Sequence, residues 1–343
     1  MSNVVINPYS FAGVDERFML TITAASFILK FRGNTDVEID WDDGTIEIYV
    51  AASGADQSHT YSGSGTYQIK ITGQISQIYN YQYSGLADID SIDNWGSSAW
   101  TTFDYMFAGR GVAGISFDIV ATDVPDLSGV TSMKRLFEKC TVTDTGGSVG
   151  DWDVSNVVNM EFFGYQADVS ALSIGGWDVG QVTDFERSFS GGTGSFSDIS
   201  DWDTSSALNM FNMMASNYVP DIDIGKWDVS NVTNMQQLLY KPSNPTGLFN
   251  QSLANWNIQN VTTMATMIVR QALSSNGALA QTNYGLTLIG WTGWSGGAAT
   301  KTVQNNVPFY IGTTKCPSGG DAEDARDWLI DTKGWVITDG GLV

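Results

Sequence analysis

The sequence is poor in the side chains that most enzyme sites use. Its 343 residues include one histidine, His59, and two cysteines, Cys140 and Cys316. His59 lies in a His-Thr-Tyr strand motif, which leaves no histidine for a Ser–His–Asp triad elsewhere. The two cysteines have neither metal-ligand spacing nor a disulfide framework. We therefore expect no catalytic residue, no cofactor and no metal ligand, and two buried free thiols, whose redox state stays open.

Positive charge and long apolar runs are also scarce. Lys and Arg total 16 against 37 Asp and Glu, which gives a formal net charge of −21. Such a field repels nucleic acid and anionic membranes, so neither is an expected partner. No apolar run reaches the ~18 residues of a transmembrane helix, and we expect no membrane insertion. Solubility accounts for the charge; the alternatives are calcium binding and contact with a basic partner.

Carboxylates alone could still support one kind of enzyme. Glycoside hydrolysis needs only a pair of them, and the chain has many. Nothing in the sequence singles out such a pair, because acids recur at equivalent positions of a repeat and so indicate architecture. We predict that the protein is not an enzyme, with a polysaccharide-degrading glycosidase as the outlying alternative.

Aromatic residues and glycine are abundant, and they belong to an internal repeat. The repeat is anchored on tryptophans that are 25, 25, 25 and 29 residues apart, at Trp152, Trp177, Trp202, Trp227 and Trp256. Two degenerate copies precede them, one starting at Trp95 and one with Pro125 in the Trp position. A period of about 25 residues is within the range of leucine-rich repeats.

The apolar positions around each Trp predict the fold of one repeat. Alternating apolar residues before the Trp predict a short strand. Apolar residues at spacings of three and four after it, such as Val232, Met235 and Leu238, predict a short helix. The serines before that helix are its predicted caps: Ser155, Ser205 and Ser230. We expect the Trp and Met columns to be core, and the Asp after the Trp to satisfy backbone N–H groups at the corner.

Stacking such units predicts the fold class. We expect an α/β solenoid of the leucine-rich-repeat type, with about seven repeats, a parallel sheet on one side and short helices on the other. A small β-sandwich precedes it, because strand patterns alternate between residues 14 and 75. The predicted domains are residues 1–80 (β-sandwich), 81–280 (solenoid) and 281–343 (capping segment, with an amphipathic helix at 325–330).

Two parts of the chain resemble known families. Residues 227–235, WDVSNVTNM, resemble the consensus of the BspA-like leucine-rich-repeat surface proteins, and the likeness covers roughly residues 90–343. Residues 284–291, YGLTLIGW, are similar to the closing segment of that family. In the N-terminal part, Trp41-Asp42-Asp43-Gly44 followed by His59-Thr60-Tyr61 resembles a PKD-like (Ig-like) β domain. Both resemblances imply adhesion rather than chemistry.

The resemblance also implies a setting. BspA-like proteins are bacterial surface adhesins, and related repeats occur in phage virion proteins. Residues 1–8 show no signal-peptide pattern, which favours a phage structural protein at the virion surface. We expect a tail fibre, receptor-binding or decoration component that contacts other virion proteins or a host surface glycan or protein. A bacterial cell-surface or extracellular adhesin is the alternative; the receptor and the oligomeric state stay open.

Two candidate sites follow from residue patterns. The residues four positions before each Trp should point away from the core and form a flat, mildly acidic binding face: Ser148, Ser173, Asp198, Asp223 and Ser252. In the β domain, Asp40, Asp42 and Asp43 could bind Ca²⁺ together with backbone carbonyls. A turn with solvated acids is the favoured interpretation of those three residues.

Overall fold

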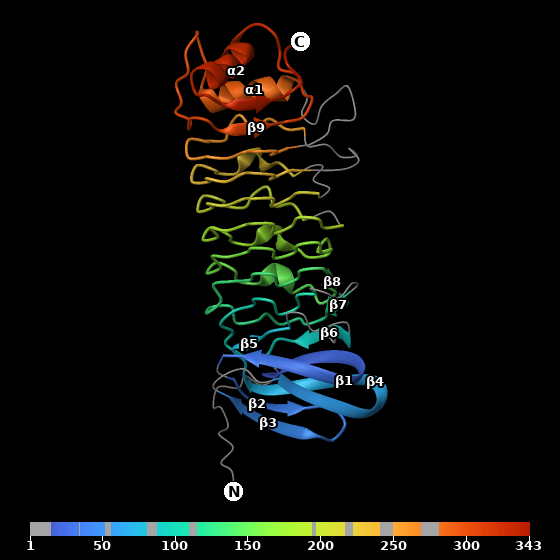
Figure 1. Cartoon of the computed structure of the whole chain (residues 1–343). Helices are drawn as coiled ribbons and strands as arrows, with labels where there is room; N and C mark the ends of the chain where they lie inside the picture. The colour runs from blue at the N-terminus through green and yellow to red at the C-terminus, as the bar shows by residue number, and fades with distance from the viewer. Residues whose placement is uncertain are drawn as a thin grey trace.

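The computed structural model describes an elongated molecule (Figure 1). A β-sheet forms the N-terminal end, a stack of chain turns follows, and two helices close the C-terminal end. The structure describes residues 15–33, 35–51, 56–80, 88–109, 115–193, 197–216, 222–240, 250–268 and 281–343. A continuous cluster of buried side chains runs through these residues from Phe18 to Trp335.

The N-terminal sheet has eight strands in the order β3-β2-β4-β1-β6-β7-β8, with β5 also paired to β1. Its strands are β1 (Phe18–Arg32), β2 (Thr35–Asp40), β3 (Ile46–Ala51), β4 (Asp56–Gln74), β5 (Gln77–Ile78), β6 (Ile89–Asn94), β7 (Ile115–Ile119) and β8 (Cys140–Thr143). In the first half of β1, alternate residues are buried, among them Phe18, Leu20 and Ile22, as expected for a strand with one face on the core.

The expected separate β-sandwich is wrong. Strand β1 pairs antiparallel with both β4 and β6, and β6 continues in parallel register to β7 and then β8. One sheet therefore runs from the N-terminal strands into the first repeats. In a free-standing unit this edge of β1 would be unpaired, but here β6 pairs with it. The domain boundaries at residues 80 and 280 stay predictions.

The predicted α/β solenoid of the leucine-rich-repeat type is also wrong. In the described residues, the α-helices are α1 (Gln281–Thr292) and α2 (Asp321–Asp331), and both follow the last Trp repeat. The strand predicted before the Trp is wrong as well, because this segment forms a single 3-10 turn in three repeats: η2 (Val149–Asp151), η3 (Ile174–Gly176) and η4 (Ile224–Lys226). From Ser132 to Thr263, isolated parallel bridges link successive turns in place of a continuous parallel sheet. We call residues 95–268 the repeat stack.

Hydrogen bonding between turns explains why no helix forms after the Trp. The amides of Met160 and Phe162 donate to the carbonyls of Asp184 and Glu186 in the next turn, at 3.0 and 2.7 Å. The amide of Phe163, which follows them, donates back to Met160 at 3.1 Å. An α-helix needs each N–H for its own i−4 carbonyl. Here the amides of Met160 and Phe162 are used by the neighbouring turn instead.

Backbone conformation leads to the same conclusion. The residue ten positions after the Trp or Pro slot has a positive φ in every copy: Tyr105, Arg135, Phe162, Arg187, Asn212, Gln237 and Thr266. Left-handed residues do not continue a right-handed helix. The spacing of three and four that predicts a helix arises here from consecutive tight turns, which bring the same positions to the core.

The predicted tryptophan and methionine core columns are confirmed. Trp152 and Trp177 stack with ring centroids 6.1 Å apart, and the Met column from Met133 to Met264 is fully buried. Each later indole N–H donates to a carbonyl of the preceding turn at 2.9–3.1 Å, in the pairs Trp177–Val149, Trp202–Ile174, Trp227–Ile199, Trp256–Ile224 and Trp291–Leu253. The column therefore binds neighbouring turns by packing and by hydrogen bonds.

The C-terminal segment closes the stack. Trp291, in α1, occupies the next place in the Trp column, and Thr287 Oγ1 accepts the amide of Leu253 at 3.0 Å. Gly290 is required there, because a Cβ would lie 2.3 Å from the carbonyl oxygen of Ala254. Strand β9 (Pro308–Tyr310) continues the bridge column and pairs with β10 (Val336–Thr338). The amphipathic helix expected at 325–330 is confirmed as part of α2.

Both cysteines are free and buried, as expected. The Sγ of Cys140 donates to the carbonyl of Phe107 at 2.9 Å, and burial raises the pKa of its thiol. Burial also raises the pKa of Cys316, to about 11. Neither thiol is therefore set up as a nucleophile at neutral pH. Within the described residues, no helix has the length and apolar character needed to cross a membrane.

Candidate functional site: the acidic face of the repeat stack

The single histidine has a structural place in the N-terminal sheet. His59 stacks on Trp41 with centroids 4.9 Å apart, and its Nε2 is 2.9 Å from Asp43 Oδ2. This hydrogen bond is the largest of the effects that lower the pKa of Asp43. His59 thus bonds the turn after β2.

The proposed calcium ligands hold the same turn together. Asp40 Oδ1 accepts the amide of Asp42, and Asp42 Oδ2 accepts the amide of Gln68, both at 3.0 Å. Lys70 Nζ lies 3.8 Å from the other oxygen of Asp42. In the part of the chain that the structure describes, no group of three or more His, Cys, Asp or Glu is arranged to hold a metal ion. These contacts are those of a turn, and calcium binding remains an untested alternative.

The predicted binding face is only partly exposed. Ser173, Asp198 and Asp223 are exposed and Ser252 is half-buried, but Ser148 is buried, with 3% of its surface accessible. The prediction for Ser148 is wrong because the Asp144 carboxylate accepts the amides on both sides of it and its own, which draws this segment inward.

These positions do not lie on a sheet face either. Asp198 accepts the amide of Ser200 at 2.9 Å and Asp223 that of Gly225 at 3.2 Å, so each closes a tight turn just before a Trp. The residues are nevertheless on the surface of the stack, beside a row of acids that the sequence analysis did not identify as a site.

That row consists of the residues on either side of each Trp. We call it the acidic face; its exposed members are Asp151, Asp153, Asp178, Asp201, Asp203 and Asp228, together with Asp198 and Asp223. Lys226 adds one cation, 3.2 Å from Asp201, with both side chains largely exposed. The repeated Asp-Trp-Asp pattern was the available signal, but one repeat alone does not show that these acids line up.

The acids that follow the Trp have a structural task as well. Asp153, Asp203 and Asp228 each accept the amide two residues on, from Ser155, Ser205 and Ser230, at 2.9–3.1 Å. The expectation that these acids satisfy corner N–H groups is confirmed. The expectation that the serines cap helices is wrong, because their amides donate to the Asp and no helix follows.

Acid pH is expected to loosen these turns. Asp126, which follows Pro125, accepts the amide of Ser128 at 3.0 Å in the same way as the acids after the Trp. Hydrogen bonds from the hydroxyl and the amide of the residue two positions on hold the pKa of Asp126, Asp153 and Asp203 below the ordinary value of 3.8. A carboxyl whose pKa is lowered by folding stabilises the fold above its unfolded pKa, and this contribution is lost as pH falls through the folded value. Urea unfolding between about pH 6 and about pH 2.5 should show stability falling below about pH 4.

A matched variant separates these turns from general acid denaturation. Asn257 occupies the same place and accepts the amide of Gln259 at 3.3 Å without a titrating group. Replacing Asp126, Asp153 and Asp203 by asparagine should therefore flatten the pH dependence while the fold persists. An unchanged pH profile in this variant would show that the three carboxylates do not contribute.

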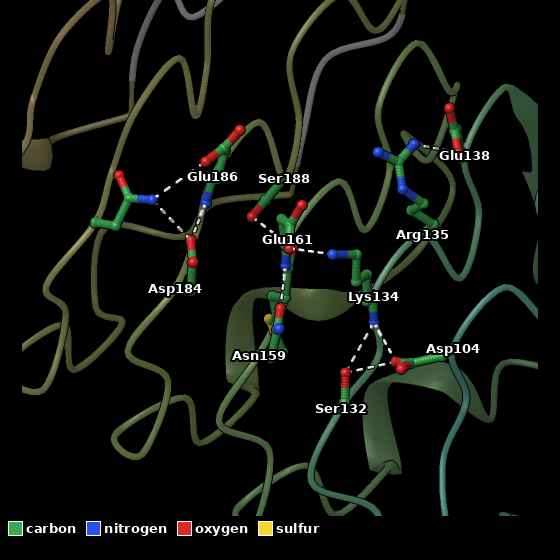
Figure 2. A network of polar contacts seen from close by, with 12 residues as sticks. Asp104, Ser132, Lys134, Arg135, Glu138, Asn159, Glu161, Asp184, Glu186 and Ser188 are labelled. Atoms are coloured by element: carbon green, nitrogen blue, oxygen red, sulfur yellow. Dashed lines mark hydrogen bonds and ion pairs between the residues drawn. The ribbon is translucent and has the colours of Figure 1, made fainter.

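A polar network elsewhere in the stack is paired within itself (Figure 2). Asn159 and Asp184 accept the amides of Glu161 and Glu186 at 2.7 and 2.8 Å, and Lys134 forms an ion pair with Glu161. Arg135 likewise binds Glu138, at 2.8 Å. In this network each cation is paired with an acid, whereas the acidic face carries eight exposed carboxylates beside Lys226. The acidic face is therefore the better candidate for a partner.

The repeat stack lies within the residues that match a known protein family. The family described as "Mycoplasma protein of unknown function, DUF285" matches residues 64–168, 101–216 and 162–281. Together these matches cover residues 64–281, which is more than half of the chain. The chain belongs to the DUF285 family. This family is related to the BspA-like repeat proteins, and the comparisons support neither a phage origin nor a PKD-like domain. No curated protein and no solved structure matches the chain.

Proposed function

We propose that this DUF285 protein is a non-enzymatic attachment protein that binds a basic protein surface through the acidic face of its repeat stack. The observation that carries this proposal is the alignment of eight exposed carboxylates along consecutive turns with Lys226 as their cation. Complementary charge steers association and sets specificity more than it adds affinity. A row of like charges on one side of an elongated molecule suits a partner with an extended basic surface.

The packing of the stack supports a role in display. Neighbouring turns approach so closely that a Cβ on Gly175 would lie 2.2 Å from the carbonyl oxygen of Asp198. The Trp column adds a hydrogen bond across each of these contacts. Each turn therefore rests on its neighbours, and exposed side chains recur at regular intervals. Such a scaffold keeps a row of charges in register with a partner.

The setting we propose is the surface of a virion, as a tail fibre, receptor-binding or decoration component. The resemblance of the repeats to surface-exposed ones supports a surface role, and a bacterial cell surface is the competing setting. Mass spectrometry of purified particles tests this choice. Presence in a bacterial envelope fraction together with absence from virions would contradict it.

Charge reversal on the acidic face is expected to weaken capture of the partner. Asp151→Lys and Asp201→Lys change two exposed residues just before a Trp, whose carboxylates are not those that close the corner turns. Immobilised protein would be incubated with dissociated virion proteins, and captured material quantified at ~0.05, ~0.15 and ~0.5 M salt. Capture by the wild type should fall as salt rises, and each variant should capture several-fold less at low salt.

The control variant makes the same charge change at a residue outside the acidic face. Asp331, the last residue of α2, is exposed at the C-terminal end. Asp331→Lys should leave capture unchanged. Equal loss in all three variants would assign the effect to net charge and not to the acidic face, and salt-independent capture would contradict an electrostatic partner surface.

A further inference from the structure

The outer strand of the N-terminal sheet has features that the proposed function does not use. β3 is the terminal strand of the sheet order and, in the described part of the chain, pairs on one side only, with β2. Edge strands expose backbone N–H and C=O groups that can pair with another chain. Figure 1 places β3 at the N-terminal end of the molecule, away from α1 and α2.

The outward row of β3 is apolar and strongly exposed. Ile46, Ile48 and Val50 alternate along the strand and are 59%, 75% and 71% exposed. The one charged residue of the strand, Glu47, faces the other way and accepts the indole N–H of Trp41 at 3.0 Å. Natural edges are commonly protected by an outward charge, a proline or a bulge. β3 has none of these on its exposed row.

The row is complementary to itself. In an antiparallel pair, residues directly opposite each other lie on the same face of the sheet. A two-fold axis through Ile48 would place Ile48 against Ile48 of a second copy, and Ile46 against Val50. This register matches the full row, and any shift leaves an apolar residue unmatched or moves the row to the other face.

We propose that two copies of this chain associate through antiparallel pairing of their β3 strands, with Ile48 on the two-fold axis. The edge supplies the hydrogen bonds, and the matched apolar rows supply the buried surface. The two copies would form one continuous sheet through their N-terminal ends. A homodimer with this symmetry uses the same patch on both subunits, as the alternation of β3 allows.

Charge explains why this edge, and not another surface, suits a second copy. The chain carries −21, so two copies repel wherever their acids meet. Glu47, the acid of β3 itself, lies on the other face of the sheet, where it binds Trp41. On the face of the apolar row, the nearest acids are on β2: Asp36, Glu38 and Asp40, opposite Val50, Ile48 and Ile46. In the paired arrangement the two β2 strands are three strand spacings apart, about 14 Å. That distance exceeds the Debye length of ~10 Å at ~0.1 M salt, so the repulsion is largely screened.

The arrangement has a consequence for attachment. β3 lies at the end of the molecule opposite the C-terminal helices. A dimer joined through β3 therefore carries two repeat stacks and two acidic faces. Two linked sites bind a surface with higher avidity than one. The 6 residues of β3 in each copy form a small interface, so we expect association to depend on concentration.

Sedimentation of the whole chain over a range of concentrations, at ~0.05 and ~0.3 M salt, tests the association. We expect a monomer–dimer equilibrium that strengthens with salt, the reverse of the salt effect expected for the acidic face. Ile48→Lys and Ile48→Glu alone should each weaken association about tenfold, since like charges would meet on the axis, and a mixture of the two variants should restore it. Leu208→Lys, at another exposed apolar residue, should change nothing.

Cysteine substitution tests the register. Opposed residues have Cα atoms ~4.5–5.5 Å apart, within the range for a disulfide. Ile48→Cys should therefore form a dimer under mild oxidation. Val50→Cys, which is equally exposed, would lie ~13 Å from its own counterpart and should not. Both native thiols are buried and do not compete.

Three results would overturn the proposal. The first is a monomer at every concentration, and the second is equal crosslinking of the two cysteine variants. The third is a monomer in which the thiol of the Ile48→Cys variant is protected from labelling, which would assign the edge to another segment of the same chain. Loss of β3 pairing would leave capture through the acidic face intact at high protein density. Failure of this inference and failure of the proposed function are therefore distinguishable.

Discussion

Replacing Trp202 by alanine is expected to lower the free energy of unfolding by about 3–5 kcal/mol, the range for removing a large buried aromatic. Trp202 is 3% exposed and packs against Phe185 and Phe189, with ring centroids 6.0 and 5.9 Å away. Its indole N–H also donates to the carbonyl of Ile174 at 3.1 Å. The substitution thus removes core contacts and leaves a buried carbonyl without this donor.

The loss should also uncouple the two halves of the stack, because stability in stacked repeats passes through neighbour contacts. Chemical denaturation followed by tryptophan fluorescence and circular dichroism should show a broadened or two-step transition. Trp202→Phe, which keeps an aromatic ring and removes the N–H, should show a smaller loss of about 1–3 kcal/mol. A change below about 1 kcal/mol for the alanine variant would contradict the central place of this column.

Replacing Asp339 by asparagine is expected to destabilise the C-terminal end by about 3–5 kcal/mol, because it removes the buried counter-charge of a shielded arginine. The remaining acid beside Arg326 is the half-exposed Asp327, at 3.5 Å. Arg326 donates to both oxygens of Asp339, from Nε at 2.8 Å and Nη2 at 3.0 Å. Tyr284 Oη–H and the amide of Gly341 donate to the same carboxylate at 2.8 and 2.9 Å. The side chains of Asp339 and Arg326 are 2% and 15% exposed.

The pKa of Asp339 shows whether burial or hydrogen bonding has the larger effect on its carboxylate. Burial by itself would raise this pKa, but the hydrogen bonds from Arg326, Gly341 and Tyr284 hold it below the ordinary value. The pair therefore stabilises the fold above the unfolded pKa of about 3.9, and this contribution is lost as pH falls through the lowered folded value. Thermal unfolding at about pH 7 and at about pH 3 should show the wild type approaching Asp339→Asn at the lower pH.

A double-mutant cycle provides the control for this pair. Arg326→Met combined with Asp339→Asn should be less destabilising than the sum of the single changes, since the double variant leaves no unpaired charge. The exposed pair Lys226–Asp201 is the reference, and Lys226→Ala should change stability by less than about 1 kcal/mol. Additive effects at Arg326 and Asp339 would contradict a coupled pair.

The parts of the fold that follow from short-range chemistry could be predicted. The 25-residue spacing of Trp152, Trp177 and Trp202 predicts a buried column, because one repeat cannot bury its own indole. The Asp after each Trp predicts a corner turn, since its carboxylate reaches the amide two residues on. These predictions depend on contacts within a repeat or between similar neighbours.

The predicted helices failed for a reason that the sequence does not show. Apolar spacings of three and four fit a helix and also fit successive tight turns, and the choice depends on where the amides donate. In this molecule the amides of Met160 and Phe162 donate to the next turn, which supplies carbonyls at the same spacing. The partner that decides the local structure is 24 residues away in sequence, as in the pair Met160 and Asp184.

The candidate site, too, has features that could be predicted from the sequence and features that could not. Residue type and spacing were enough to predict the period, the buried Trp and Met columns, the Asp turns and the excess of negative charge. Three further features became visible only in the folded chain: Ser148 is buried, the acids beside each Trp line up as one face, and β6 joins the N-terminal strands to the first repeats. Those features depend on how turns stack and which strand edges meet, and the hydrogen bonds that select them join residues far apart in the chain.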